Sequence, residues 1–285
     1  MIRRLCVIGV GLIGGSLALA LRRAGYCGQI VGAGRHAAHL ARAVELGVID
    51  GHDLDLGQAV AGSDMVVLAV PMGAMKGALA AIRDHLAPDA VLTDVGSAKA
   101  AVIAAAQEAF GALPPGFVPG HPIAGTEHSG VDAAFPELFQ GRRVILTPTP
   151  ASSAQAVAAV RAMWEAAGAV VEDMDAVTHD RVLAATSHLP HVLAYALVHS
   201  LSRMGNDADV LRYAAGGFRD LTRIAGSDPV MWRDICLTNA PAILESLDAF
   251  RADLDELTRA IAAGDGPRIE TIFREAKRTR DTFRS

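Results

Sequence analysis

Four short segments of the sequence carry polar residues where neither a buried core nor an ordinary surface loop requires them. They read DVGSAK at 94–99, GHPIAGTEHSG at 120–130, TSHLPH at 186–191 and FRDLTRIA at 218–225. Histidines and arginines recur in them, and these side chains titrate near neutrality or bind anions. Such residues suit an enzyme that moves a proton and holds an acidic small molecule.

His121 is the first candidate for chemistry, because it stands at a predicted strand end beside a glycine-rich turn. Removal of hydride from a carbinol requires a base for the hydroxyl proton, and an imidazole has a suitable pKa. A histidine that only caps the turn with one hydrogen bond would look the same in the sequence. The position of His121 leaves both interpretations open.

Two further histidines, His188 and His191, are three residues apart, so both can lie on one face of a helix. Pro190 between them cannot donate a backbone N–H and is expected to kink that helix. A kink at a polar point of an apolar helix favours a binding site, although one buried histidine is most often structural. With His121 and His128 the pair could supply nitrogen ligands, but no His-Glu-x-x-His pattern, cysteine partner or acidic cluster accompanies them. No metal is therefore expected.

The last segment holds two arginines, Arg219 and Arg223, which are four residues apart and can lie on one helix face. A planar guanidinium binds a carboxylate through two parallel hydrogen bonds, so the pair could recognise an acidic substrate. A solvated or salt-bridged helix face is the ordinary alternative. Apolar neighbours predict partial burial and favour the substrate role; these neighbours are Phe218, Leu221 and Ile224.

The glycine-rich segment GVGLIGGS at 9–16 indicates what positions these side chains. Its first, third and sixth residues, Gly9, Gly11 and Gly14, form G-x-G-x-x-G between a predicted strand at 4–9 and a predicted helix at 12–24. In such a turn the first glycine permits the bend, the second lets the backbone approach a pyrophosphate, and the third allows close helix packing. The motif predicts a Rossmann-type dinucleotide site. Further cofactor contacts are expected from Leu12, Ile13, Arg35, His36, Val70 and Pro71.

The second predicted strand, at 29–33, bears on the choice of cofactor. An NAD-specific site usually has an acidic residue about 20 residues past the glycines, where it binds the ribose 2′-OH. Arg35 stands there instead, and an arginine at that place can pair with a 2′-phosphate. A solvated arginine at a helix start is the plain alternative. The sequence favours NADP, or the use of both NADP and NAD.

Short β-branched runs alternate with Ala-rich helical stretches up to residue 174. These runs are nearly continuous in apolar residues, which is typical of strands buried on both faces of a parallel sheet. Besides the two strands above, the pattern predicts strands at 65–70, 90–95, 116–119 and 143–147, and a helix at 36–46; its character changes after 169–174. The predicted class is α/β, with an N-terminal Rossmann-type, doubly wound, mostly parallel sheet in a dinucleotide-binding domain, residues 1–174.

From residue 175 to the end only helical periodicity is found. Breaks are expected near Gly205, 216–217, 226–229 and 264–267. Residues 175–285 are therefore predicted to form an all-helical C-terminal domain.

The bulk composition limits the classes of function. The 285 residues are 51% hydrophobic and 20% charged, which allows two globular domains, and a net charge of −5 argues against a nucleic-acid binder. Three cysteines without a Cys-x-x-Cys pair predict free thiols in a reducing compartment. Glycines interrupt the apolar run at 5–21 and two arginines close it, which argues against a signal peptide or a membrane span. A cytoplasmic protein that binds neither nucleic acid nor membrane is expected.

Taken together and in this order, the segments resemble the prephenate/arogenate (cyclohexadienyl) dehydrogenases of tyrosine biosynthesis. The resemblance spans nearly the whole chain, and its most specific pieces are GHPIAG at 120–125 and SHLPH at 187–191. It implies oxidative decarboxylation of prephenate to 4-hydroxyphenylpyruvate, or of arogenate to tyrosine, with hydride transfer to NAD or NADP. It also implies a homodimer formed through the helical domain. The choice of substrate and inhibition by tyrosine stay open.

The same resemblance implies roles for single residues. His121 is expected to take the proton of the ring C4 hydroxyl, and Ser97 to orient that hydroxyl. Arg223 is expected to hold a substrate carboxylate, and His191 to lie at the substrate. Further substrate contacts are implied for Thr126, Glu127, Ser187, His188 and Trp232.

Two other functions fit the same layout. A β-hydroxyacid dehydrogenase or imine reductase also combines a Rossmann domain with a helical one. The hydroxyacid enzymes use a lysine in a G-x-x-K-x-x-N helix, whereas the second domain of this chain has only Lys277, near the terminus. A non-catalytic NADP-binding sensor would keep 9–16 and would have no need for His121, Ser97 and Arg223 together.

Overall fold

The computed structural model describes residues 1–203 and 215–282, and the break expected near Gly205 lies outside them. Contacts divide the chain into two compact units, Met1–Ala240 and Pro241–Ser285. The domain boundary predicted near residue 174 lies within the first unit and stays a prediction. In the part of the chain described, no helix combines the length and the apolar character needed to cross a membrane.

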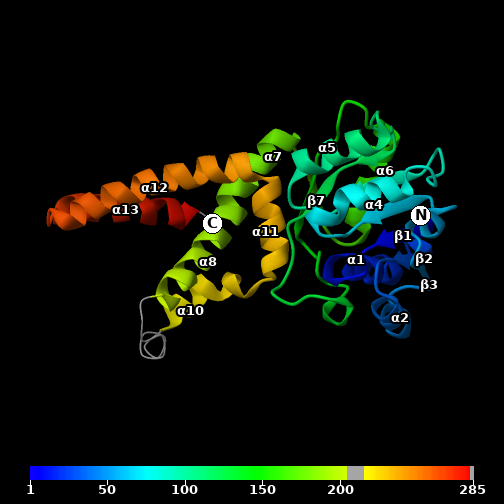
Figure 1. Cartoon of the computed structure of the whole chain (residues 1–285), viewed down its shortest axis with the longest axis horizontal. Helices are drawn as coiled ribbons and strands as arrows, with labels where there is room; N and C mark the ends of the chain where they lie inside the picture. Colours follow the sequence, from blue (N-terminus) through cyan, green and yellow to red (C-terminus); the bar gives the residue numbers. More distant parts are fainter. Residues whose placement is uncertain (204–214, 283–285) are drawn as a thin grey trace. The chain divides into compact units, whose positions relative to one another are not determined.

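A six-stranded parallel sheet forms the centre of the first unit (Figure 1), with the strand order β3-β2-β1-β4-β5-β6. The central strands are buried because their β-branched and apolar residues contact helices on both faces. The sheet confirms the predicted Rossmann-type class. Its strands are β1 (Ile2–Ile8), β2 (Cys27–Ala33), β3 (Gly51–Asp53), β4 (Met65–Leu68), β5 (Val91–Asp94) and β6 (Phe117–Val118). Strand β3 was not predicted, because its sequence GHD has no apolar run.

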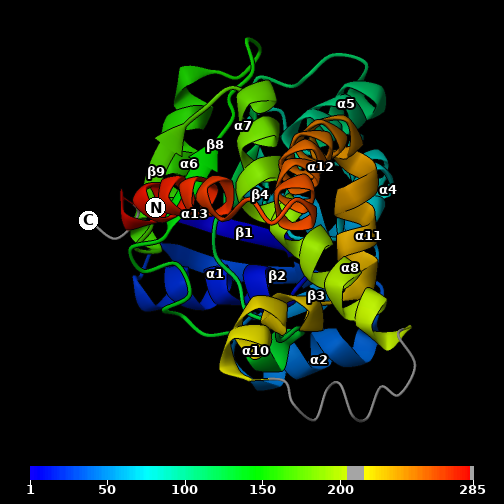
Figure 2. The same ribbon diagram turned by 90° about the vertical axis from the view of Figure 1, so that its left-hand side faces the viewer.

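Helices cover both faces of this sheet (Figure 2). Successive residues of β1 alternate between the two layers: Val7 packs in the core with Leu17 and Trp164, whereas Ile8 packs in the other core with Leu79. The helices are α1 (Leu12–Arg23), α2 (Ala37–Glu45), α3 (Leu56–Val60), α4 (Met75–Ile82), α5 (Lys99–Phe110) and α6 (Ala154–Ala166), with 3-10 turns η1 (Met72–Ala74) and η2 (Val131–Ala133).

A second, three-stranded sheet contains β7 (Gly120–Pro122), β8 (Arg143–Leu146) and β9 (Val170–Asp173). β7 pairs with β8 antiparallel, and β8 pairs with β9 parallel. The strand predicted at 116–119 ends one residue too late. The chain leaves the first sheet after Val118, and β7 of the second sheet starts at Gly120. Pro119 separates the two strands, since it has no N–H to continue a ladder.

From residue 176 on, every described element is helical. Asp175 begins α7 because its carboxylate accepts the Thr178 N–H at 2.9 Å. The interruption expected at Pro190 takes the form of a π-helical turn just before it, and Pro190 lies in the first turn of the next helix, where its missing N–H is not needed. The elements of the first unit are α7 (Ala176–Leu183), η3 (Ala184–His188), α8 (Leu189–Ser202), α10 (Gly216–Thr222), η4 (Arg223–Gly226) and α11 (Pro229–Thr238).

Helix α12 (Ala240–Ala262) leads into the second unit, which it forms with α13 (Gly266–Thr282). The turn between them uses Gly264, whose φ of 64° is in the left-handed region. An ion pair between Arg268 and Glu256 joins the two helices.

The three cysteines of the chain are free. Cys6 is buried in β1, and burial raises the pKa of its thiol to about 12, so it is an unreactive core residue. Cys27 and Cys236 are half-buried.

Candidate active site

The three glycines of the 9–14 turn have different surroundings. Gly9 has a φ of 96°, and a Cβ added there would overlap the Ala69 carbonyl. A Cβ on Gly14 would overlap the Gly9 carbonyl oxygen and the Val7 side chain, so this glycine permits close helix packing. Around Gly11 nothing lies within 4 Å of such a Cβ, so the backbone there is open to a ligand.

The same turn begins α1, with Gly11 as the N-cap and no side-chain cap among the described residues. The N–H groups of the first helical turn therefore face the open space beside Gly11, as pyrophosphate binding at a helix N-terminus requires. These features fit a bound dinucleotide.

A cavity of about 820 Å³ opens beside this turn, and most of the residues singled out from the sequence line it. Fourteen of them line it: Gly11, Leu12, Ile13, Val70, Pro71, Ser97, His121, Thr126, Glu127, Ser187, His188, His191, Arg223 and Trp232. Four others do not: Gly9 and Gly14 support the turn from behind, and Arg35 and His36 lie exposed after the end of β2.

Parallel strand ends explain part of this convergence. Leu68 of β4 is paired with Asp94 of β5, so Val70 and Ser97 follow the strands at the same carboxyl edge of the sheet. The next segment, β7, places His121 at this cavity.

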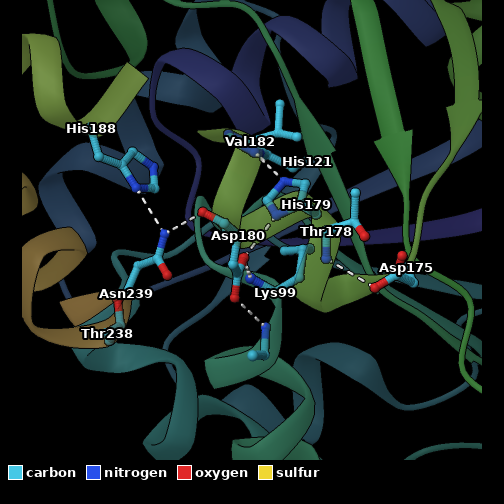
Figure 3. Close-up of polar contacts among 12 residues, drawn as sticks. Lys99, His121, Asp175, Thr178, His179, Asp180, Val182, His188, Thr238 and Asn239 are labelled. Carbon is cyan, nitrogen blue, oxygen red and sulfur yellow. Dashed lines mark hydrogen bonds and ion pairs between the residues drawn. The ribbon is translucent and has the colours of Figure 1, made fainter. Parts of the chain in front are cut away.

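His121 is the first member of a buried hydrogen-bonded chain (Figure 3). Its Nδ1 lies 2.9 Å from Nε2 of His179, and His179 Nδ1 lies 2.8 Å from Asp180 Oδ1. The Asp180 carboxylate also accepts the backbone N–H groups of Lys99 at 2.7 Å and Ala100 at 2.9 Å. Burial alone would raise the pKa of Asp180, but the hydrogen bonds from His179 and these two N–H groups lower it, so Asp180 is ionised at neutral pH.

Burial also lowers the pKa of His121 to well below 6.5, and the neighbouring His179, Lys99 and His188 lower it further. At neutral pH His121 is therefore an uncharged imidazole on the cavity wall. A neutral imidazole in this position can take a proton from a bound ligand.

A fully buried ion pair lies beneath His121. Lys99 Nζ contacts the Asp94 carboxylate, both side chains are 0% exposed, and Nζ also donates to the Gly120 carbonyl at 2.6 Å. The Asp94 carboxylate accepts the Gly96 N–H at 2.7 Å and the Gly120 N–H at 3.2 Å. Burial lowers the pKa of Lys99, and Asp94 opposes that shift. The pair ties the ends of β5 and α5 to the strand that carries His121.

His188 lies on the cavity from the π-helical turn and is 1% exposed. Its Nδ1 is 3.1 Å from Nδ2 of Asn239, which also donates to the Asp180 carbonyl at 2.8 Å. Burial lowers the pKa of His188 to about 4, so this imidazole is also neutral at pH 7.

His191 stacks on Trp232, with ring centroids 3.6 Å apart and an angle of 18° between the rings. Its Nδ1 donates to the Ser187 carbonyl at 2.9 Å. The tryptophan is buried, so it holds the histidine ring in one orientation at the cavity.

Arg223 and Glu127 face each other at the exposed edge of the cavity, 3.5 Å apart, with side chains 62% and 43% exposed. The partial burial predicted for the arginine pair is wrong. Helix α10 has only seven residues and buries none of them, Leu221 is 61% exposed, and Arg219 does not line the cavity.

Sequence reasoning missed five polar residues that support the site: Asp94, Lys99, His179, Asp180 and Asn239. Asp94 and Lys99 belong to a segment that was singled out, but no role was assigned to them. The adjacent His179 and Asp180 in the middle of α7 are a weak local signal for the buried chain. Nothing in the sequence places His179 against His121, 58 residues away.

Two family profiles match the chain. One, described as "Prephenate dehydrogenase, nucleotide-binding domain", matches residues 17–173. The other, described as "Prephenate dehydrogenase, dimerization domain", matches residues 175–275. Together they cover well over half of the chain.

Named relatives agree with these profiles. A cyclohexadienyl dehydrogenase from Zymomonas mobilis is 43% identical, over 98% of this chain and 95% of that protein. A prephenate dehydrogenase from Bacillus subtilis is 35% identical, over 96% of this chain and 74% of that protein.

Solved structures show the same architecture. A prephenate dehydrogenase from A. aeolicus, in complex with hydroxyphenyl propionate and NAD+, superposes with a TM-score of 0.92 at 36% identity and covers 99% of both chains. A Synechocystis arogenate dehydrogenase superposes with a TM-score of 0.82 at 30% identity, covering 98% of this chain and 99% of that one.

Proposed function

This chain belongs to the prephenate dehydrogenase family, and from that membership we propose that its cavity is an active site in which His121 is the base. The protein is an oxidoreductase of tyrosine biosynthesis that uses a nicotinamide cofactor for oxidative decarboxylation. The observation that carries the site proposal is a neutral, half-buried imidazole on the wall of the same cavity as the open glycine turn. The rival enzyme classes and the sensor are not favoured.

The proposed chemistry uses few groups. A substrate of this class carries two carboxylates and a cyclohexadienol ring. The bound nicotinamide supplies an acceptor for the hydride that leaves ring C4. His121 takes the hydroxyl proton at the ring nitrogen that faces the cavity, and Ser97 orients that hydroxyl. Loss of the ring carboxylate as CO₂ then leaves an aromatic phenol, which makes the reaction irreversible.

Gly11, Leu12, Ile13, Val70 and Pro71 would hold the dinucleotide, since they line the cavity around the open N-terminus of α1. The direct test of the whole proposal is to mix the protein with prephenate or arogenate and either cofactor, and to follow the absorbance of the reduced cofactor. If the cofactor is reduced with neither prephenate nor arogenate, the proposal is wrong. The ratio of kcat/KM for the two substrates decides between prephenate and arogenate, both of which occur in the names of its relatives.

We further propose that residues 1–174 bind the dinucleotide and residues 175–285 complete the substrate site and the contact between two copies. The match of 175–275 to a dimerization domain supports this division. Large apolar side chains of α12 and α13 are also exposed in the chain by itself, namely Leu244, Leu254, Ile261 and Phe273.

Arg35 is proposed to accept the 2′-phosphate of NADP. It is exposed, lies two residues after the end of β2, and has no ion pair with another residue of 1–203 or 215–282. We expect Arg35→Ala to raise the KM for NADP about tenfold or more, because a charge-assisted hydrogen bond is lost. The KM for NAD, measured on the same preparation, serves as the control and should change little. An equal change for both cofactors would contradict the role.

Arg223 is proposed to bind a substrate carboxylate at the exposed edge of the cavity. We expect Arg223→Ala to raise the KM for prephenate about 10- to 100-fold with a smaller change in kcat, since a bidentate contact is lost. Arg219→Ala is the matched control, because Arg219 is exposed on the neighbouring helix and lies outside the cavity. An unchanged KM in Arg223→Ala, or the same rise in both variants, removes the assignment.

A further inference from the structure

Two histidines of the cavity wall, His121 and His188, are both connected to Asp180, but through different atoms of that residue (Figure 3). The carboxylate reaches His121 by way of the His179 ring. The main-chain carbonyl reaches His188 by way of the Asn239 amide. Neither His179 nor Asn239 lines the cavity, so both act from behind the residues that do.

The first connection allows only one arrangement of protons when both rings are neutral. An ionised carboxylate only accepts hydrogen bonds, so His179 carries its proton on Nδ1, the atom next to Asp180 Oδ1. Nε2 of His179 then holds a lone pair and accepts a hydrogen bond from Nδ1–H of His121. His121 is left with an unprotonated Nε2 as its second ring nitrogen.

The second connection gives the opposite result at His188. The Asp180 carbonyl only accepts, so the group of Asn239 beside it is the NH₂, and that NH₂ also donates to Nδ1 of His188. A neutral His188 with a lone pair on Nδ1 carries its proton on Nε2. That Nε2 is buried and has no hydrogen-bond partner within residues 1–203 and 215–282. A buried donor without a partner costs free energy unless a ligand accepts from it.

We propose that Asp180 and Asn239 are positioning residues that set opposite proton positions on the two cavity histidines. His121 presents a lone pair that accepts a proton from the substrate, and His188 presents an N–H that donates to a substrate oxygen. The inference rests on the proposed function, because it takes His121 as the base. When His121 Nε2 takes the hydroxyl proton, both N–H bonds of the chain stay in place. The new positive charge is stabilised through His179 by the Asp180 carboxylate.

The charged and titratable groups around His121 come from three elements. They are His179 on α7, Lys99 on α5 and His188 in the π-helical turn, with Asp180 behind His179. His179, Lys99 and His188 disfavour a charged His121. The Asp94 carboxylate of β5 also lies nearby, but it is paired with Lys99. Asp180 is the carboxylate that the hydrogen-bonded chain connects to His121, so it can stabilise the charge that forms there in the transition state.

Nitrogen NMR of histidine-labelled protein at neutral pH reads these proton positions directly, independently of turnover. We expect His121 to be protonated at Nδ1 and His188 at Nε2, with signals assigned by their loss in His121→Asn and His188→Asn. A proton on His121 Nε2 or on His188 Nδ1 in the wild type overturns the inference. This outcome is separate from a failure of the proposed function, which would appear as unchanged turnover in His121→Asn.

Two variants separate the connections. Asp180→Asn keeps the carbonyl but removes the charge, so the proton on His121 divides between its two nitrogens while His188 is unchanged. Asn239→Asp replaces the donor by an acceptor, so the proton of His188 moves to Nδ1 while His121 is unchanged. We expect kcat to fall about 100-fold in the first variant, as for loss of a carboxylate that orients a catalytic histidine. In the second variant we expect kcat to fall about tenfold, as for the loss of one hydrogen bond to the substrate.

Asp175→Asn is the matched control, because it makes the same change of charge on α7, and the Asp175 side chain only caps that helix. Its kcat should stay within about twofold of wild type, since asparagine also caps helices well. A purely structural role for Asp180 would lower thermal stability and raise KM with no selective loss of kcat. That result, or unchanged histidine signals together with wild-type kcat in Asp180→Asn, overturns the inference.

Discussion

We expect His121→Asn to lower kcat for prephenate or arogenate by about 100-fold or more, while the dissociation constant for the cofactor stays the same. The loss has the size of a missing general base. Asparagine keeps a polar group of similar volume near His179, so the surrounding structure has little reason to change. Steady-state kinetics and cofactor titration by fluorescence measure the two quantities separately.

The pH profile provides a second measurement on the same variant. Protonation inactivates the base, and the pKa of His121 is well below 6.5, so wild-type kcat/KM should be constant through pH 6.5 and fall only in more acidic solution. In His121→Asn this acidic limb should disappear. His199→Asn, an exposed histidine of α8, is the control and should keep it. Wild-type turnover in His121→Asn would remove the assignment of the base.

The largest expected effect on stability comes from Lys99→Met. This change leaves the Asp94 carboxylate without its cation in a fully buried position, and breaking a buried pair in this way costs about 3–5 kcal/mol in the free energy of unfolding. The Gly120 carbonyl loses its donor as well, so kcat should fall through displacement of the strand that carries His121. Denaturant unfolding at neutral pH measures the first effect, and steady-state kinetics measure the second.

A double variant tests whether the buried charge is the cause. Asp94→Asn combined with Lys99→Met removes both charges, and the oxygen of the amide introduced at position 94 would still accept backbone N–H groups. The double variant should be more stable than the sum of the single changes predicts. Lys76→Met breaks a pair with Glu108 that is exposed on both sides, so it should change stability little. Strictly additive single effects, or an equal loss in Lys76→Met, would contradict the explanation.

Much of the fold follows from the local sequence. Runs such as MVVLAV at 65–70 have the continuous apolar character of strands that are covered on both faces, and such runs mark the parallel sheet. The features that were missed lack this signal. Strand β3 has only three residues, and β7 contains a glycine, a histidine and a proline, so neither shows a periodicity that reveals a strand. Their pairing with longer neighbours makes them strands.

Sequence alone also pointed to the cofactor turn, and most of the site residues that it singled out line the cavity. The glycine spacing has a local physical reason: a side chain at Gly9 or Gly14 would overlap neighbouring atoms, and Gly11 leaves the backbone open to a ligand. The residues after β4 and β5 could be placed together, because parallel strands end at one edge of a sheet. No such rule brings His188, His191 and Arg223 of the helical part to the same cavity; their approach depends on how the helices pack.

The buried polar connections are what only the tertiary structure decided. His179 meets His121 across 58 residues, Asn239 meets Asp180 across 59, and Asp180 receives the N–H of Lys99 across 81. A local sequence pattern reports which face of an element is buried, but it does not report which polar group lies opposite. That choice is made by the packing of distant elements, since most buried donors and acceptors find their partners there.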